Sequence, residues 1–180
     1  MFEEDKRLIQ ELKQGNKEAL RRVYEEHKDK LLTVAVSMLH DYGAAEDILH
    51  DVFVSFAAGV GRLNIKISIR RYLIASVVNR IRDIYRKKRP KMVELENVEL
   101  ADTHAEAPAT VAVSDEQAEI LTDALAQIPT EQREVIVLHL NGGLKFNEIA
   151  EMKGISTSTI QGRYRYGLEK LRTILAGGIS

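Results

Sequence analysis

The residues with the clearest binding chemistry lie near the C-terminal end of this 180-residue sequence. They mix hydroxyl, amide and guanidinium groups: Ser158, Thr159, Gln161, Gly162, Arg163, Arg165 and Tyr166. Such groups hydrogen-bond to phosphate oxygens and to base edges in the major groove of DNA. An ordinary helical hairpin with a solvated polar face would carry similar residues, so the pattern alone leaves that alternative open.

The residues that precede this stretch follow the pattern of a helix-turn-helix. Ala150 is small where a second helix must cross closely, and Gly154 suits a left-handed turn between two helices. Ile155 can fill the core below that turn, and Ser156 can cap the next helix. An apolar stripe then faces inward at Ile160, Tyr164, Gly167, Leu168 and Leu171. This context favours a DNA-reading helix that begins near Ser156.

An acidic helix face is the second candidate site, in the stretch 43–58. Apolar residues recur there every three or four positions, at Ala45, Ile48, Leu49, Val52, Phe53 and Phe56. Glu46 and Asp47 suit the positive end of a helix, but Asp51 lies too far along for that explanation and weakly repels Asp47. The face therefore invites a basic partner. A solvated acidic face is an equally good explanation without further context.

A basic stretch is the third candidate site. Nine lysines and arginines and a single acid, Asp83, lie between Arg70 and Lys91. On a helical wheel the expected core residues are Ile69, Leu73, Ser76, Val77, Ile81 and Ile84. The opposite side carries Arg71, Asn79, Arg82, Arg86 and Arg89. Such a stripe suits DNA phosphates, and its binding would weaken with salt as counterions are released. A solvated basic face is the alternative.

Composition excludes several classes of protein. Lysine and arginine total 26 against 27 acids, and the two signs are segregated, because 93–123 contains acids and no lysine or arginine. Cysteine is absent, and the five histidines lack the spacing of metal ligands. We find no phosphate loop, His-Glu-x-x-His motif or nucleophile elbow, so we expect no enzyme, metal or cofactor. The acidic start and the lack of a long apolar run predict a cytoplasmic protein without membrane insertion.

Helical periodicity dominates the chain and predicts an all-α fold. The expected helices span 3–14, 16–40, 43–58, 68–89, 115–127, 130–141, 145–152 and 156–176. The stretch 90–114 loses that periodicity and has the composition of a tether. We therefore expect two small helical domains, 1–92 and 115–180, joined by a flexible acidic linker at 93–114.

The C-terminal motifs resemble region 4 of the extracytoplasmic-function (ECF) group of sigma-70-type RNA polymerase sigma factors. The resemblance rests on Ile128-Pro129, Gln132-Arg133-Glu134-Val135, Gly143-Leu144, Phe146, Glu148-Ile149-Ala150, Gly154-Ile155, Thr159 and Arg163. It implies a helix-turn-helix that reads the promoter −35 element through the polar residues named first. Lys145 stands where the family usually has a capping hydroxyl, and Gln161-Gly162 replaces a basic residue and serine.

The N-terminal half is similar to region 2 of the same family. Ala45-Glu46-Asp47 through Asp51-Val52-Phe53 matches the helix that docks on polymerase, which implies that Asp47, Ile48, Asp51, Val52 and Phe53 contact it. The resemblance also implies −10 DNA contacts by Leu63, Asn64, Ile65, Lys66, Arg71, Tyr72, Asn79, Arg82 and Arg86. Tyr72 replaces the family's tryptophan. The change matters little if this ring packs internally, and weakens melting if the ring stacks on bases.

The resemblance implies a sigma factor that directs promoter-specific initiation. Its implied partners are bacterial RNA polymerase core, through the clamp helices of the largest subunit and the flap of the second-largest subunit, and promoter DNA, both duplex and single-stranded. An anti-sigma factor commonly accompanies such a protein. The rival hypotheses are a DNA-binding regulator that does not enter polymerase, a protein-interaction module and an enzyme.

Overall fold

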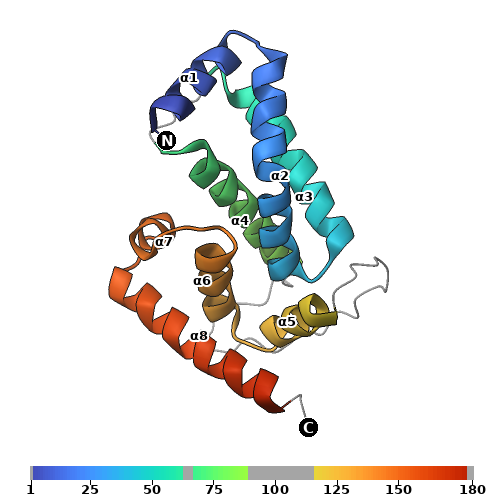
Figure 1. Ribbon diagram of the computed structural model, residues 1–180, viewed down its shortest axis with the longest axis vertical. Coiled ribbons are helices and arrows are strands. Elements are labelled where there is room, and N and C mark those ends of the chain that lie inside the picture. Colours follow the sequence, from blue (N-terminus) through green and yellow to red (C-terminus); the bar gives the residue numbers. More distant parts are fainter. Residues whose placement is uncertain (1, 63–66, 89–115, 178–180) are drawn as a thin grey trace.

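The computed structural model describes residues 2–62, 67–88 and 116–177, and every regular element in these ranges is an α-helix (Figure 1). The first half contains α1 (Phe2–Lys13), α2 (Lys17–Leu39), α3 (Tyr42–Gly59) and α4 (Ile69–Lys88). The second half contains α5 (Glu116–Ala126), α6 (Thr130–Leu140), α7 (Phe146–Lys153) and α8 (Thr157–Gly177). The expected all-α fold is confirmed, with each helix boundary within one residue of its prediction. The predicted linker at 93–114 lies outside the described residues.

Short turns with capping side chains connect the first three helices. The Asn16 carboxamide oxygen accepts hydrogen bonds from the backbone N–H groups of Glu18 (2.9 Å) and Ala19 (3.2 Å), which begins α2. Asp41 caps α3 in the same way through the Ala44 N–H, at 2.9 Å. Only two residues separate α2 from α3, so the two helices run back alongside each other (Figure 1).

Helix α4 is buried on more of its circumference than its sequence predicts. Six core positions were expected. Four of them, Ile69, Leu73, Val77 and Ile81, are fully buried, and a fifth, Ile84, is half-buried. Ser76, the sixth, is also half-buried, and its hydroxyl donates to the Tyr72 carbonyl at 2.9 Å. The prediction missed two residues on another side of the helix, Ile74 and Val78, and both are fully buried. Helix α4 is therefore buried on two faces, whereas the helical wheel predicted one buried face.

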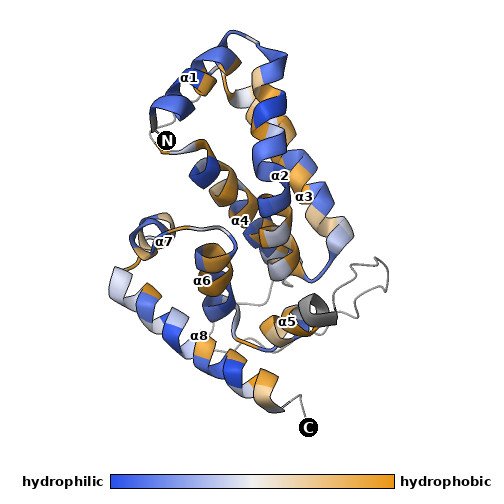
Figure 2. Cartoon of the chain, in the orientation of Figure 1, coloured by the Kyte–Doolittle hydropathy of each residue, from blue (hydrophilic) through white to orange (hydrophobic). Residues whose placement is uncertain are grey.

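The two halves of the chain meet where α2 and α4 lie against α5, α6 and α7. The Asn141 carboxamide nitrogen donates to the Ser37 hydroxyl at 3.1 Å, and the His40 Nε2 lies 3.0 Å from the Thr122 carbonyl. Figure 2 shows hydrophobic residues of α4 and α6 in the middle of the molecule, where the halves meet. Among the described helices, none combines the length and apolar content that a bilayer crossing would need.

A buried carboxylate joins three helices where the halves meet. Glu134 on α6 is 6% exposed, and its Oε1 accepts a hydrogen bond from the Arg82 guanidinium of α4 at 2.7 Å. Its other oxygen, Oε2, pairs with the Lys153 ammonium at the end of α7. A buried charge is tolerated only where opposite charges and hydrogen bonds replace water. Glu134 therefore ties the position of α7 and that of α4 to α6.

We predict that Glu134→Gln lowers the free energy of unfolding by about 3–5 kcal/mol, because it leaves the nearly buried Lys153 ammonium without its carboxylate. Urea unfolding followed by circular dichroism measures this change. Glu131→Gln, on the same helix, is the control. Its carboxylate is 63% exposed, so the loss there should stay within about 1 kcal/mol. Equal losses in the two variants would contradict the structural role of Glu134.

Stability should also fall in mild acid because of His40. Burial, with a smaller effect from the Arg133 charge, lowers the pKa of this imidazole below its ordinary value of 6.5. As the pH falls below 6.5, the unfolded chain binds a proton that the folded chain does not, so unfolding is favoured until the lowered pKa is passed.

The test compares urea unfolding at pH 7.5 and pH 5.5 for the natural chain and for His40→Asn. Asparagine tolerates the left-handed backbone at this position, where φ is 57°. Burial also lowers the pKa of His27, which both proteins retain. The variant should therefore lose less stability in acid than the natural chain. Identical losses would show that His40 does not contribute.

Candidate functional site

The helix-turn-helix turn has the geometry that its sequence predicts. Gly154 ends α7 in the left-handed conformation, with φ of 67°, and its N–H donates to the carbonyls of Ala150 and Glu151. The Ile155 N–H donates to the Ala150 carbonyl at 3.1 Å. The Ser156 hydroxyl then accepts the Thr159 N–H at 3.1 Å and caps α8. The turn therefore fixes the start of α8 relative to α7.

An aromatic cluster holds α6, α7 and α8 together behind this turn. The His139 ring stacks on Phe146 with centroids 4.2 Å apart, and Tyr164 meets both rings at 5.1 Å. The His139 Nδ1 lies 2.8 Å from the Leu144 carbonyl, which orients the imidazole. Because α8 contributes Tyr164 to this cluster, its opposite face must point away from α6 and α7.

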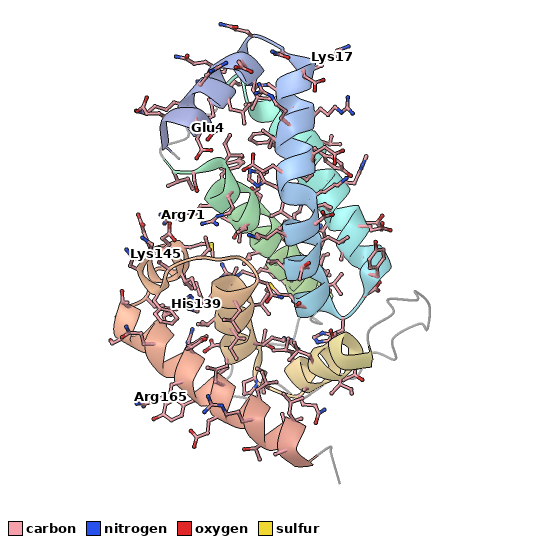
Figure 3. The ribbon with its side chains drawn as sticks, in the orientation of Figure 1. Glu4, Lys17, Arg71, His139, Lys145 and Arg165 are labelled. Atoms are coloured by element: carbon pink, nitrogen blue, oxygen red, sulfur yellow. The ribbon has the colours of Figure 1, made fainter. Side chains whose placement is uncertain are left out.

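The outward face of α8 carries most of the predicted −35 readers. Ser158, Thr159, Gln161, Arg165 and Tyr166 are exposed. Figure 3 shows Arg165 on the outer side of α8, away from the first half of the chain. Its guanidinium lies 4.9 Å from the centre of the Tyr166 ring, and its Nη2 donates to the Tyr166 hydroxyl at 3.3 Å. The structure therefore gathers these residues on one accessible surface.

Arg163 lies at the border of that surface. Its guanidinium pairs with the Glu131 carboxylate of α6, and its side chain is 25% exposed. Lys145, where the family has a capping hydroxyl, begins α7 without a side-chain cap. The Glu148 carboxylate accepts the Lys145 N–H at 2.8 Å and supplies half of a capping box. The Lys145 backbone N–H therefore has a hydrogen-bond partner, although no hydroxyl caps this helix.

Acids from the second half of the chain split the predicted basic stripe of α4. The Arg71 guanidinium donates to Glu151 of α7 at 2.7 Å, and Arg82 donates to Glu134 at the same distance. Arg70, one residue earlier, reaches the Gly143 carbonyl at 3.3 Å. Figure 3 shows Arg71 on α4 directed toward the second half. Two of the predicted −10 contacts therefore lie at the junction of the halves.

The remaining described residues of the stripe face solvent. Asn79 is exposed, and Arg86 is exposed and pairs with Asp83 at 2.9 Å. Asp83 is the acid of α4 itself that balances the stripe, and Glu134 and Glu151 add to it from other helices. A helical wheel cannot reveal them, since they come from helices 52 and 80 positions further along the chain. Arg89 and the predicted −10 contacts Leu63, Asn64, Ile65 and Lys66 lie outside the described residues.

Tyr72 packs inside the first half. Its ring lies 5.8 Å from that of Phe56, at an angle of 48°, and the residue is half-buried. Phe56 itself is 1% exposed. Of the two alternatives for this position, internal packing is therefore the one that the geometry favours.

The predicted docking residues of α3 divide into two groups. Asp47 and Asp51 are exposed, and Asp51 pairs with Arg80 of α4 at 3.6 Å, so its basic partner lies within the chain. Ile48 and Val52 are buried in the core and are not presented to solvent. Phe53 is 7% exposed, and its ring packs edge-on against Tyr24 of α2 with centroids 4.9 Å apart. The acids are thus the accessible part of this prediction.

An open groove between α2 and α3 is a feature that the sequence analysis missed. It has a volume of about 640 Å³, and its apolar lining is Leu20, Tyr24, Leu32, Leu49, Phe53, Val54 and Ala57. Val54 is 53% exposed and Tyr24 is 41% exposed. Charges of both signs surround them at Lys17, Arg21, Lys28, Asp29 and Glu46. The signal was available, because Leu20, Tyr24 and Leu32 recur at multiples of four beside the buried stripe of α2.

The described residues contain no group of three or more His, Cys, Asp or Glu side chains placed to hold a metal ion. Three protein surfaces make up the candidate site: the outward face of α8, the basic side of α4, and the groove with the acids of α3.

Both halves match known family models. Residues 23–91 match the model described as Sigma-70 region 2, and residues 124–173 match Sigma-70, region 4. The two matches follow each other in the expected order. Each includes the candidate surfaces of its half, apart from the first part of the groove on α2.

Curated relatives match this chain across both halves and over most of its length. The ECF RNA polymerase sigma factor SigW of Bacillus subtilis is 26% identical over 176 residues, which cover 93% of this chain and 94% of SigW. The RNA polymerase sigma factor CarQ of Myxococcus xanthus is 27% identical over 170 residues, covering 93% and 95%.

Among solved structures, CnrH in complex with the cytosolic domain of CnrY aligns with a TM-score of 0.70 and 22% identity, covering 96% of this chain and 97% of that one. The sigma factor RpoE of Bartonella quintana, in complex with NepR, aligns with a TM-score of 0.65 and 20% identity, covering 89% and 96%. These two similarities show a shared fold. The two matched family models place this chain among the sigma-70-type RNA polymerase sigma factors, and the curated relatives that match both of its halves include a member of the ECF group.

Proposed function

We propose that this sigma factor divides its work between the two halves, so that the first half docks on core polymerase and captures the −10 element while α8 reads the −35 element. The observation that carries the proposal is the polar outward face of α8 on a complete helix-turn-helix. In such motifs the second helix enters the major groove and presents its N-terminal residues to the bases.

The exposed residues of α8 fit that role chemically. Arginine donates two hydrogen bonds to guanine, and hydroxyls and amides bind bases or phosphates. Ser158, Thr159 and Gln161 lie in the first turns of α8, where a recognition helix approaches base edges. Arg165 and Tyr166 continue the same face one turn further along.

The proposed docking surface for polymerase is the groove between α2 and α3 together with Asp47 and Asp51. Its occupant is the helical clamp of the largest polymerase subunit. The exposed Val54 and Tyr24 supply apolar contact area, and charges of both signs at the rim suit a helix that carries both. The flap of the second-largest subunit is the partner proposed for the second half.

Capture of the −10 strand at α4 is proposed to require separation of the two halves. Arg71 and Arg82 donate to Glu151 and Glu134 in the described arrangement, so those donors are occupied. A DNA phosphate, like these carboxylates, is an anionic hydrogen-bond acceptor for arginine, and it takes their place when the halves part. Asn79 and Arg86 already face solvent and need no such change.

The proposal includes no catalytic activity for this chain itself, since the family is generally non-enzymatic. It also places the protein in the cytoplasm, with the polymerase. An anti-sigma factor is the third proposed partner, supported by the structure of RpoE, which is in complex with the anti-sigma factor NepR.

Reconstitution with bacterial core polymerase and run-off transcription on genomic DNA fragments tests the function. We expect promoter-specific transcripts only when both the chain and core polymerase are present. Salt-dependent duplex binding that needs no polymerase would instead support the rival DNA-binding regulator. No specific transcript with polymerase from the matching organism would contradict the proposal.

A first residue-level prediction concerns Arg163. Arg163→Ala should weaken holoenzyme binding to a −35 duplex by roughly 5- to 100-fold, the size of one good base or phosphate contact, while polymerase binding persists. The matched control is Glu131→Gln, which removes the partner of this guanidinium and keeps the guanidinium itself. Fluorescence anisotropy with labelled duplex measures both. Equal losses in the two variants would show that the ion pair, and not DNA contact, is what matters.

A second prediction concerns docking. Asp51→Arg should abolish association with core polymerase, because it reverses the charge of the docking face, while circular dichroism stays native. Glu26→Arg is the matched control, since Glu26 is exposed on α2 and does not line the groove. Size-exclusion chromatography with core polymerase separates the outcomes. Unchanged association of the Asp51 variant would remove α3 from the docking surface.

A further inference from the structure

Helix α8 contains a glycine that the fold does not require. Gly162 is the sixth residue of this 21-residue helix. Glycine inside a helix is less stable than alanine, because it gives up more conformational freedom on folding. Among the described glycines, those with positive φ are Gly15, Gly143 and Gly154, so Gly162 has no special backbone conformation to explain it. A Cβ atom built at Gly162 meets no atom of the described residues within 4 Å.

A second glycine of the same helix shows what a structural requirement looks like. A Cβ atom at Gly167 would lie 2.8 Å from the Ile136 Cδ1 and 3.1 Å from the Gln132 Cβ. Gly167 is buried where α8 crosses α6, so its missing side chain permits that close crossing. Gly162 has no such neighbour among the described residues. No packing contact in the described part of the chain therefore accounts for its missing side chain.

The position of Gly162 on the helix indicates where that reason lies. Each residue turns an α-helix by about 100°, so Gly162 lies opposite the buried Ile160 and Leu171. Ser158 and Arg165 lie on one side of it, Thr159 and Tyr166 on the other, and all four are exposed. Gly162 thus lies on the centre line of the helix face that the proposed function assigns to DNA binding.

A helix that enters the major groove comes nearest to the base edges along the centre line of its inserted face. We propose that Gly162 is a specificity determinant of this sigma factor: its missing side chain lets the α8 backbone lie close to the base pair beneath it. The neighbouring side chains then reach bases that a bulkier residue at position 162 would hold away. This inference rests on the proposed −35 function and explains why a less stable residue stands in an otherwise unobstructed position.

The test uses holoenzyme assembled from core polymerase and the full chain. A duplex pool with a randomised upstream element is selected for binding, and the enriched sequence is then measured by anisotropy with the natural chain and with Gly162→Ala. We expect the variant to bind that sequence about tenfold more weakly, comparable to loss of one good base contact. Its melting temperature should nevertheless rise by about 2–4 °C, because alanine favours the helix.

Gly177→Ala is the matched control. Gly177 ends the same helix, and a Cβ atom there also meets no described atom within 4 Å, but it lies about four turns from Gly162. This variant should bind the selected duplex as the natural chain does. A Gly162→Ala variant that is more stable and binds equally well would overturn the inference and leave the proposed function intact. If the natural holoenzyme enriches no upstream sequence, the proposed function itself fails.

Discussion

The buried carboxylate of Glu134 is the interaction on which the arrangement of this protein depends. Its two oxygens have different partners: Lys153 within the helix-turn-helix and Arg82 in the other half of the chain. The first pair fixes α7, and therefore the turn that begins α8, against α6. The second sets the same α6 against α4. One side chain thus links the geometry of the DNA-reading unit to the placement of the first half.

The two partners of Glu134 have different consequences when the halves separate. Lys153 is 10% exposed and belongs to the same unit as Glu134, so this pair can persist and the carboxylate keeps a counter-charge. Arg82 is 41% exposed and would be released to water or to a phosphate. Separation therefore costs less than breaking an isolated buried ion pair, and it frees a cation on the face proposed to capture DNA.

The sequence predicted the elements and the local chemistry of this structure well. Helix boundaries agree because the apolar spacing of three and four residues, the caps and the glycine turn are all local signals. Gly154 and Ser156 are examples, since their roles follow from a few neighbouring residues. The same locality explains what was missed. Burial of Ile74 and Val78, and the pairing of Arg71 with Glu151, depend on segments that are distant in sequence.

Burial also changes how predicted contact residues should be understood. Val52 and Asp51 are neighbours in one predicted docking motif, yet Val52 is 3% exposed and the side chain of Asp51 is 60% exposed. A helix that packs on a core with one face can present only the other to a partner. In the proposed docking, the apolar contribution therefore comes from residues such as Val54 and Tyr24, which remain exposed beside the same helix. A family motif thus identifies the helix, whereas the structure identifies the side chains that a partner can reach.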